Sequence, residues 1–198
     1  MKKLFILALL IGSAAVGAQA QNTVRVGESG GGLAYDKGDK IFQIGLGLGR
    51  AVGGYNWGYG GLGASLNAAF EVGIHEYISV GPYAAIGRYN VGYILRDYSM
   101  TVFAGGVRGS FHYASLLNDA LDMSIDEEKL DLYVSLLLGV EFFSYNFDTE
   151  LPRGASRSYF DGGAVLGGRY KFNPRVAVFT ELGYAGLSVW TVGASFHL

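Results

Sequence analysis

Three histidines are the side chains of this sequence best suited to acid–base or metal chemistry, because it contains no cysteine. They are His75, His112 and His197, and no two of them have the spacing of metal ligands on one element. The glycine-rich string at residues 45–49 has no helix after it, so it does not predict a phosphate-binding loop. We therefore expect no metal and no cofactor.

A second feature with chemical meaning is a set of charged residues that stand alone in otherwise apolar or glycine-rich stretches. Five are acidic and two are basic: Glu71, Asp131, Glu141, Asp161 and Glu181, with Arg108 and Arg169. Because only 16% of the chain is charged and the net charge is −2, a nucleic-acid partner is not expected.

Strict alternation predicts the elements that position these charges. From residue 61 to residue 74 every second side chain is apolar and the others are mostly small, which puts the two kinds on opposite faces of a strand. Similar stretches predict eight strands. They lie at residues 40–50, 60–74, 77–88, 99–113, 129–143, 158–172, 175–185 and 188–198.

The high hydrophobic content of the chain, without a long apolar run, predicts a β-barrel membrane protein. Half of the residues are hydrophobic, yet no apolar run reaches the ~18 residues of a membrane-spanning helix. A closed β-barrel is the other structure that satisfies every backbone group in lipid. We therefore predict an all-β fold, an eight-stranded antiparallel transmembrane barrel with up-and-down meander topology and both termini in the periplasm.

The isolated charged residue of a strand predicts which face of that strand points into the barrel. An arginine on the lipid face near the bilayer midplane costs roughly 2–4 kcal/mol, so Arg108 is expected to point inward and Phe103 and Val107 outward. An eight-stranded barrel has room inside only for side chains, and buried charges must pair. The seven isolated charges therefore predict a salt-bridge network in the lumen.

The lengths of the connections between strands predict on which side of the membrane each lies. Those at residues 50–60, 88–99 and 144–157 are expected outside the cell, and residues 75–76 and 173–174 form tight periplasmic turns. The acidic connection 114–128 is long for a periplasmic turn; we expect a short helical turn within 116–130 and have no functional account of it. Pro82 removes a ladder hydrogen bond, which predicts a bulge in its strand.

Three segments follow along the chain. Residues 1–20 read as a cleaved signal peptide, with Lys2 and Lys3, an apolar core and the small-x-small site at residues 18–20. Residues 21–39 read as an extended periplasmic lead-in, and residues 40–198 as the barrel. The predicted location is the outer membrane, as an integral protein.

The chain resembles the small eight-stranded outer-membrane barrels of Gram-negative bacteria, the OmpA-barrel, OmpX and opacity-protein-like group. It looks most like the Bacteroidetes type. Residues 167–186, GGRYKFNPRVAVFTELGYAG, and 192–198, VGASFHL, carry the resemblance. The second stretch is similar to an assembly signal with Leu198 where an aromatic residue usually stands. The resemblance implies the outer-membrane assembly machinery as a partner.

Some barrels of this kind are lipid A-modifying enzymes, and the deacylase type has a His-x-Ser pair on the lipid side. Here Ser115 follows His112 by three residues, and His112 is expected to face inward. A nucleophile and its base must come within hydrogen-bond reach. We therefore predict no catalytic residue and no enzymatic activity.

Two arginines suggest a lipid contact. Arg50 and Arg88 are expected on the lipid-facing side at the extracellular end of their strands, at the height of the lipid A phosphates. A guanidinium can bind a phosphate through two parallel hydrogen bonds. Lipopolysaccharide contact at these two residues is one interpretation, and ordinary snorkelling side chains are the other. The expected partners are thus outer-membrane lipid and lipopolysaccharide, with the protein as a monomer.

These inferences predict a structural or surface-binding protein with a plugged polar lumen that acts through its extracellular loops. Three alternatives stay open: a narrow pore for small or hydrophobic solutes, a lipid A-modifying enzyme, and a soluble periplasmic barrel. The ligand of the loops is not specified by the sequence, because these barrels serve several functions.

Overall fold

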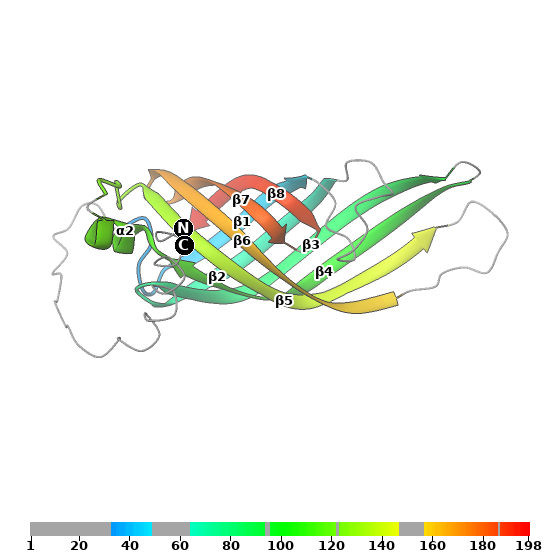
Figure 1. Cartoon of the computed structure of the whole chain (residues 1–198), viewed down its shortest axis with the longest axis horizontal. Helices are drawn as coiled ribbons and strands as arrows, with labels where there is room; N and C mark the ends of the chain where they lie inside the picture. The colour runs from blue at the N-terminus through cyan, green and yellow to red at the C-terminus, as the bar shows by residue number, and fades with distance from the viewer. Residues whose placement is uncertain (1–32, 49–63, 94–95, 122, 147–156, 186) are drawn as a thin grey trace, which may run out of the picture. The chain divides into compact units, whose positions relative to one another are not determined.

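A computed structural model describes residues 33–48, 64–93, 96–121, 123–146, 157–185 and 187–198 of the chain. They form a closed barrel in which each strand pairs antiparallel with the next and β8 returns to β1 (Figure 1). The eight-stranded up-and-down barrel predicted from the sequence is confirmed. Its strands are β1 (Lys40–Leu48), β2 (Ala64–His75), β3 (Ile78–Tyr93), β4 (Arg96–His112), β5 (Leu130–Asn146), β6 (Arg157–Asn173), β7 (Val176–Ala185) and β8 (Ser188–His197).

The two ends of the barrel differ. Near one end β1 begins and β8 finishes, with Ile41 paired to His197, and we call it the terminal end. The helix α2 (Ala114–Leu121) follows β4 there, earlier than the predicted 116–130. At the opposite end, which we call the distal end, β3 to β6 reach well beyond the other strands (Figure 1). They have 16 or 17 residues, against 9 to 12 in the others, so the distal wall is higher on one side.

The predicted connection at 88–99 is mostly strand. Pairing of β3 with β4 continues past Arg88 and Thr101 as far as Tyr93 and Arg96. Apolar alternation has ended there, but the antiparallel ladder of backbone hydrogen bonds does not depend on side-chain polarity. A sequence reading based on alternation therefore made β3 and β4 too short at their distal ends.

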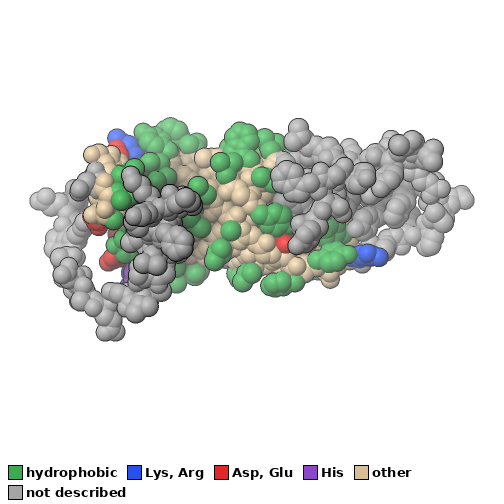
Figure 2. Space-filling view, in the orientation of Figure 1, with side chains coloured by type: hydrophobic (Ala, Val, Ile, Leu, Met, Phe, Trp, Pro, Cys, Tyr) green, Lys and Arg blue, Asp and Glu red, His purple; other side chains and the backbone are tan. Residues whose placement is uncertain are grey.

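The two faces of the wall are opposite in character. Large apolar side chains are exposed all along the outer face, as at Leu46, Leu66 and Leu136, and they cover much of the wall in the face drawn in Figure 2. On β4, Val107 is 62% exposed while Arg108 beside it is 4% exposed. An apolar exterior around a polar interior is the arrangement of a membrane-spanning barrel.

Pro82 lies on the outer face of β3, and the bulge predicted there is wrong. The β2–β3 register is the same on both sides of it, at Ala69–Tyr83 and Val72–Val80, and it shifts only near Gly73. Gly81 explains how the strands stay in step. A Cβ at this position would collide with the carbonyl oxygen of Phe70, so only glycine allows this close approach.

Candidate functional site

The middle of the lumen is crossed by an ion-paired cluster built on Arg108 of β4. Its Nε lies 3.2 Å from Oε1 of Glu71 on β2, and its Nη2 lies 2.7 Å from Oε1 of Glu181 on β7. Nη2 also donates to the hydroxyl of Ser135 at 2.8 Å. All three charged side chains are almost fully buried. One guanidinium thus connects β4 with three other strands, β2, β5 and β7, through the interior of the barrel.

A second guanidinium lies nearer the terminal end. Nη1 of Arg169 on β6 donates to Oδ2 of Asp131 at 2.8 Å, and these two residues are direct cross-strand partners. The Tyr133 ring has both guanidinium groups over it, with Cζ of Arg169 5.0 Å and Cζ of Arg108 5.4 Å from the ring centroid. Such cation–π contacts are strongest where water is excluded.

Gln43 of β1 completes this layer from the other side. In the amide orientation that satisfies both of its polar atoms, its nitrogen donates to Glu71 at 3.2 Å and its oxygen accepts from Arg169 at 3.0 Å. The layer therefore spans the whole interior between β1 and β5. We call the residues Gln43, Glu71, Arg108, Asp131, Tyr133, Arg169 and Glu181 the ionic layer.

His112 sits at the terminal side of the ionic layer between a serine and an aspartate. Its Nδ1 lies 2.8 Å from Oδ1 of Asp131, and its Nε2 lies 3.0 Å from Oγ of Ser79. The order of groups is that of a Ser–His–Asp triad. The Ser79 hydroxyl, however, donates to Oε2 of Glu71 at 2.6 Å.

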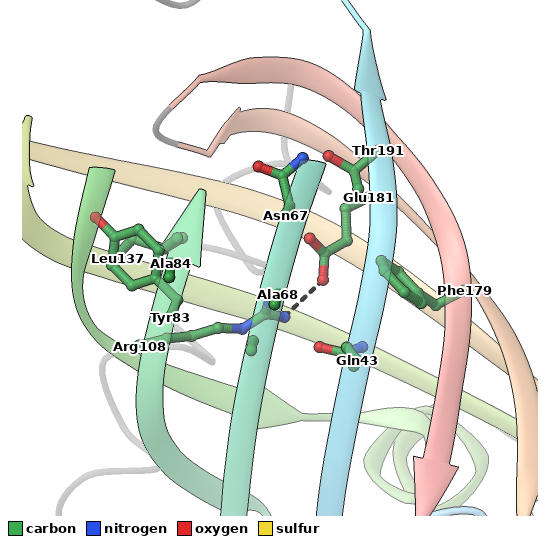
Figure 3. A pocket seen from close by; sticks show the side chains of 11 residues that line it. Gln43, Asn67, Ala68, Tyr83, Ala84, Arg108, Leu137, Phe179, Glu181 and Thr191 are labelled. Atoms are coloured by element: carbon green, nitrogen blue, oxygen red, sulfur yellow. Dashed lines mark hydrogen bonds and ion pairs between the residues drawn. The ribbon is translucent and has the colours of Figure 1, made fainter. Parts of the chain in front are cut away.

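A small cavity lies on the distal side of the ionic layer. It has a volume of about 30 Å³, and Figure 3 shows the ion pair of Arg108 and Glu181 among the side chains that line it. Asn67 and Thr191 line it from β2 and β8, and Phe179 from β7. Room of this size fits one or two water molecules.

Towards the distal end the interior contains an apolar cluster. Leu187, which follows a register shift in the β7–β8 hairpin, is completely buried in a cluster with Ala85, Val102, Ala104 and Phe143. Gly183 has a φ of +138°, which an L side chain rarely adopts, so glycine permits this bend.

Glu141 and Asp161 lie on this side as well. Glu141 on β5 is 2% exposed and its Oε1 has no hydrogen-bond partner among the described residues. Asp161 is a diagonal neighbour on β6, since its own cross-strand partner is Gly139. Two carboxyl groups therefore meet here away from the arginines.

Of the seven charges assigned to the lumen from the sequence, the structure groups five and separates two. Glu71, Arg108 and Glu181 form one ion-paired set, and Asp131 with Arg169 a second. Glu141 and Asp161 belong to neither of these two ion-paired sets. Arg88 lies exposed on the outer face of β3 and takes part in contacts of its own, and Arg50 is outside the described residues.

Sequence reasoning missed Gln43, Tyr133 and Ser79. The alternation of the sequence could have identified Gln43 and Tyr133. Gln43 alternates with the apolar residues that face outward, and Tyr133 lies two positions after Asp131, on the same face of its strand. Ser79 could not be matched to His112 without knowing the β3–β4 register, since 33 positions separate them.

Two groups outside the strands at the terminal end have shifted pKa values. Burial, followed by the charges of Asp131 and Asp39, raises the pKa of the Tyr35 phenol well above its ordinary value. Burial also raises the pKa of Asp39, but the contact with His197 at 3.7 Å and a hydrogen bond from the backbone amide of Asp36 outweigh it, so that pKa is lowered.

Neither a metal site nor a membrane helix is found in the part of the chain that the structure describes. No group of three or more His, Asp or Glu side chains is placed to hold a metal ion. None of the described helices is both long and apolar enough to cross a membrane.

Comparison with known proteins finds likeness in structure and not in sequence. No protein-family model and no curated protein sequence matches the chain. The attachment invasion locus protein Ail of Yersinia pestis is 15% identical over 82% of this chain and 99% of its own, with a TM-score of 0.47. The outer membrane protein OprG from Pseudomonas aeruginosa is 14% identical over 83% and 97%, with a TM-score of 0.49. The closed eight-stranded topology itself agrees with the fold expected from the resemblance to small outer-membrane barrels.

Proposed function

We propose that this chain is an integral outer-membrane protein with a closed lumen, which acts as a structural element of the envelope and binds through its distal surface. The terminal end faces the periplasm in this proposal, and residues 1–20 are removed on export. It is a monomer and not an enzyme. The single observation that carries the proposal is the ionic layer, in which buried side chains from six strands meet across the interior.

A closed lumen is favoured over a narrow pore by what surrounds the ionic layer. The cavity beside it has a volume of only about 30 Å³, and the buried Leu187 cluster occupies part of the interior towards the distal end. A conducting path would have to break buried ion pairs, and breaking one by removing a partner costs about 3–5 kcal/mol.

An enzymatic role is disfavoured by the direction of one hydrogen bond. Ser79, the only hydroxyl bonded to His112 in the described chain, is completely buried and donates its proton to Glu71. A serine nucleophile must instead give its proton to the histidine. Lipid A from cells with and without the protein should therefore have the same mass spectrum.

A surface role is supported by the high distal wall of β3 to β6. Tyr159 and Phe160 on β6 are 48% and 78% exposed there, and aromatic side chains provide much of the contact area in protein recognition. Strands that project beyond the shorter β1, β2, β7 and β8 give such a surface a rigid base.

Single-channel recording tests the closed lumen. The full-length protein in planar bilayers should show no steady conductance, with a general porin in the same bilayer as the positive control. Steady openings in the unmodified protein would reject the closed lumen and favour the narrow pore.

Lipopolysaccharide contact is a separate part of the proposal. Arg88 lies on the outer face of β3 distal to Ile86, as a phosphate contact requires. Arg50→Gln with Arg88→Gln should lower thermal stability in lipopolysaccharide-containing membranes and leave it nearly unchanged in neutral detergent. Arg175→Gln at the terminal end is the matched control. An equal loss in both media would mean that the arginines act within the protein.

A further inference from the structure

Residues 33–39 cross the terminal mouth of the lumen, and Tyr35 covers His112. The two rings are stacked with centroids 3.5 Å apart and planes 4° from parallel. The Tyr35 hydroxyl donates to the carbonyl oxygen of His75 at 2.8 Å, and the side chain is 6% exposed. We call residues 33–39 the latch.

The latch is tied to several parts of the barrel by hydrogen bonds. The Ala34 amide donates to the Glu127 carbonyl at 2.7 Å, and Nζ of Lys171 donates to the Leu33 carbonyl at 2.8 Å. The Gly38 amide donates to the Gly73 carbonyl at 2.9 Å. These contacts hold the ends of the latch, whereas Tyr35 alone brings it onto His112.

The hydrogen bonds around His112 determine its protonation. A serine hydroxyl has one hydrogen, and that of Ser79 is donated to Glu71, so Nε2 of His112 must donate to Ser79. Asp131 accepts from Arg169 as a carboxylate, so Nδ1 must donate to it. Both ring nitrogens then carry hydrogen, and the ring is an imidazolium.

Charge balance leads to the same state. The buried carboxylates of Glu71, Asp131 and Glu181 carry −3, and the guanidinium groups of Arg108 and Arg169 carry +2. A protonated His112 brings the sum to zero. A neutral ring would leave one uncompensated negative charge in the interior, which is costly.

We propose that the latch is proton-sensitive: the imidazolium of His112 holds Tyr35 over the terminal mouth of the lumen, and loss of its proton releases residues 33–39. A cation stacked on an aromatic face gains an attraction that a neutral ring lacks. This inference does not rest on the proposed function. The ionic layer lies deeper than the latch, so the lumen stays closed whether the latch is open or shut.

Other titratable groups also lie near the latch and His112, and the experiment must distinguish their effect from that of His112. Asp131, Tyr133 and Arg169 surround the ring from β5 and β6, and Glu71 reaches it through Ser79. Asp36 and Asp39 lie on the latch itself, with Lys171 bonded to its first residue and His197 3.7 Å from Asp39. His75 also lies against the latch, because its carbonyl oxygen accepts from Tyr35, so both His75 and His197 need a control.

Thiol labelling tests the proposal, because the chain has no cysteine of its own. Ala34→Cys places a buried reporter on the latch, and Lys37→Cys places an exposed one in the same segment. The ratio of their labelling rates with a maleimide removes the pH dependence of the thiol itself. From about pH 6 to about pH 9.5, above the ordinary histidine pKa of about 6.5, we expect this ratio to rise about tenfold.

The three histidines provide matched controls. With His112→Gln the ratio should be high at every pH, whereas with His75→Gln or His197→Gln it should rise as in the parent. A flat ratio in the parent, or an unchanged rise with His112→Gln, would overturn the proposal. The nitrogen NMR spectrum of the His112 ring tests it without a substitution in the ring: two protonated nitrogens at about pH 7 support it, and a neutral ring rejects it.

Discussion

Tyr133 on β5 donates its hydroxyl hydrogen to Oε1 of Glu181 on β7 at 2.8 Å. These strands are not neighbours, because β6 lies between them, so the bond crosses the interior and is no part of the backbone ladder. The same oxygen accepts from Arg108 on β4. A single carboxylate oxygen therefore fixes the spacing of three strands, and the cross-section of the barrel is held by side chains as well as by the sheet.

Removing the Tyr133 hydroxyl should weaken the barrel measurably. Tyr133→Phe keeps the ring between the guanidinium groups but deletes a buried hydrogen bond to a charged acceptor, which is worth about 1.5–3 kcal/mol. The free energy of unfolding in urea should fall by that amount. Tyr170→Phe, on the outer face and 44% exposed, is the control and should change it by less than about 0.5 kcal/mol.

Gly167 makes room for the same ring. It is the cross-strand partner of Tyr133, and a Cβ there would collide with Cε2 and Cζ of the tyrosine. Gly167→Ala should displace the ring and cost about 1–3 kcal/mol. At Gly168 the nearest atom to a new Cβ is Leu132 Cδ2 at 3.6 Å, so Gly168→Ala should be nearly neutral. Equal effects of the two substitutions on urea unfolding would contradict this role of Gly167.

The outer face should reject charge. Leu66 is 45% exposed on β2, whereas Ser65 beside it faces inward and is 3% exposed. Leu66→Arg should cost roughly 2–4 kcal/mol in a lipid bilayer if it lies near the midplane, and a gel assay of heat modifiability should show less folded barrel. Leu66→Val is the control. Ser65→Arg should also fail, but in detergent as much as in lipid, since its cause is overpacking inside the barrel.

The sequence predicted the strands wherever one side of the wall meets lipid. Alternation is strict along β2 because Leu66 and Val72 face lipid while Ser65 and Glu71 face a crowded interior. The same rule gave the inward phase of Arg108. The rule does not predict the strands distal to Arg88, because β3 and β4 continue to pair there without an apolar face.

The contacts of the lumen could not be predicted because they depend on register and on chain segments without periodicity. His112 was expected to face inward, but its partners come from β3 and β5 and are fixed only by pairings such as Ser79–Ser110. Tyr35 lies in a glycine-rich polar stretch that reads as an extended lead-in. No pattern in that stretch indicates that one aromatic ring stacks on a buried histidine 77 positions later.

Acid should weaken the terminal end through Asp39. Because the pKa of Asp39 is lower in the folded protein, its ionised form contributes stability that is present above the ordinary value of 3.8 and is lost as the pH falls through the folded value. Asp39→Asn should lower the thermal midpoint at neutral pH by no more than about 2–4 °C. The difference between variant and parent should shrink below about pH 4. A difference that stays constant from pH 3 to pH 7 would show that the carboxylate charge contributes nothing.

The same substitution at two inward glutamates should have opposite effects. Glu71 is ion-paired with Arg108 and accepts hydrogen bonds from Ser79 and Ser110, so Glu71→Gln leaves a cation undercompensated and should cost about 3 kcal/mol. Glu141 is as deeply buried but lies against the carboxyl group of Asp161, and its Oε1 has no hydrogen-bond donor among the described residues. Two ionised carboxylates in contact would repel, so this buried pair keeps its contact only by retaining a proton.

Glu141→Gln supplies an amide hydrogen for Asp161 without the cost of holding a proton on a buried carboxyl group, and it should therefore raise the free energy of unfolding by about 1 kcal/mol at neutral pH. Asp161→Asn, which relieves the same pair from the other side, should act in the same direction. The double variant should gain less than the sum of the two, because each change removes one shared interaction. A loss of stability with Glu141→Gln comparable to that with Glu71→Gln would mean that Glu141 is compensated by a cation, and the assignment of the two carboxyl groups as a pair that retains a proton would be wrong.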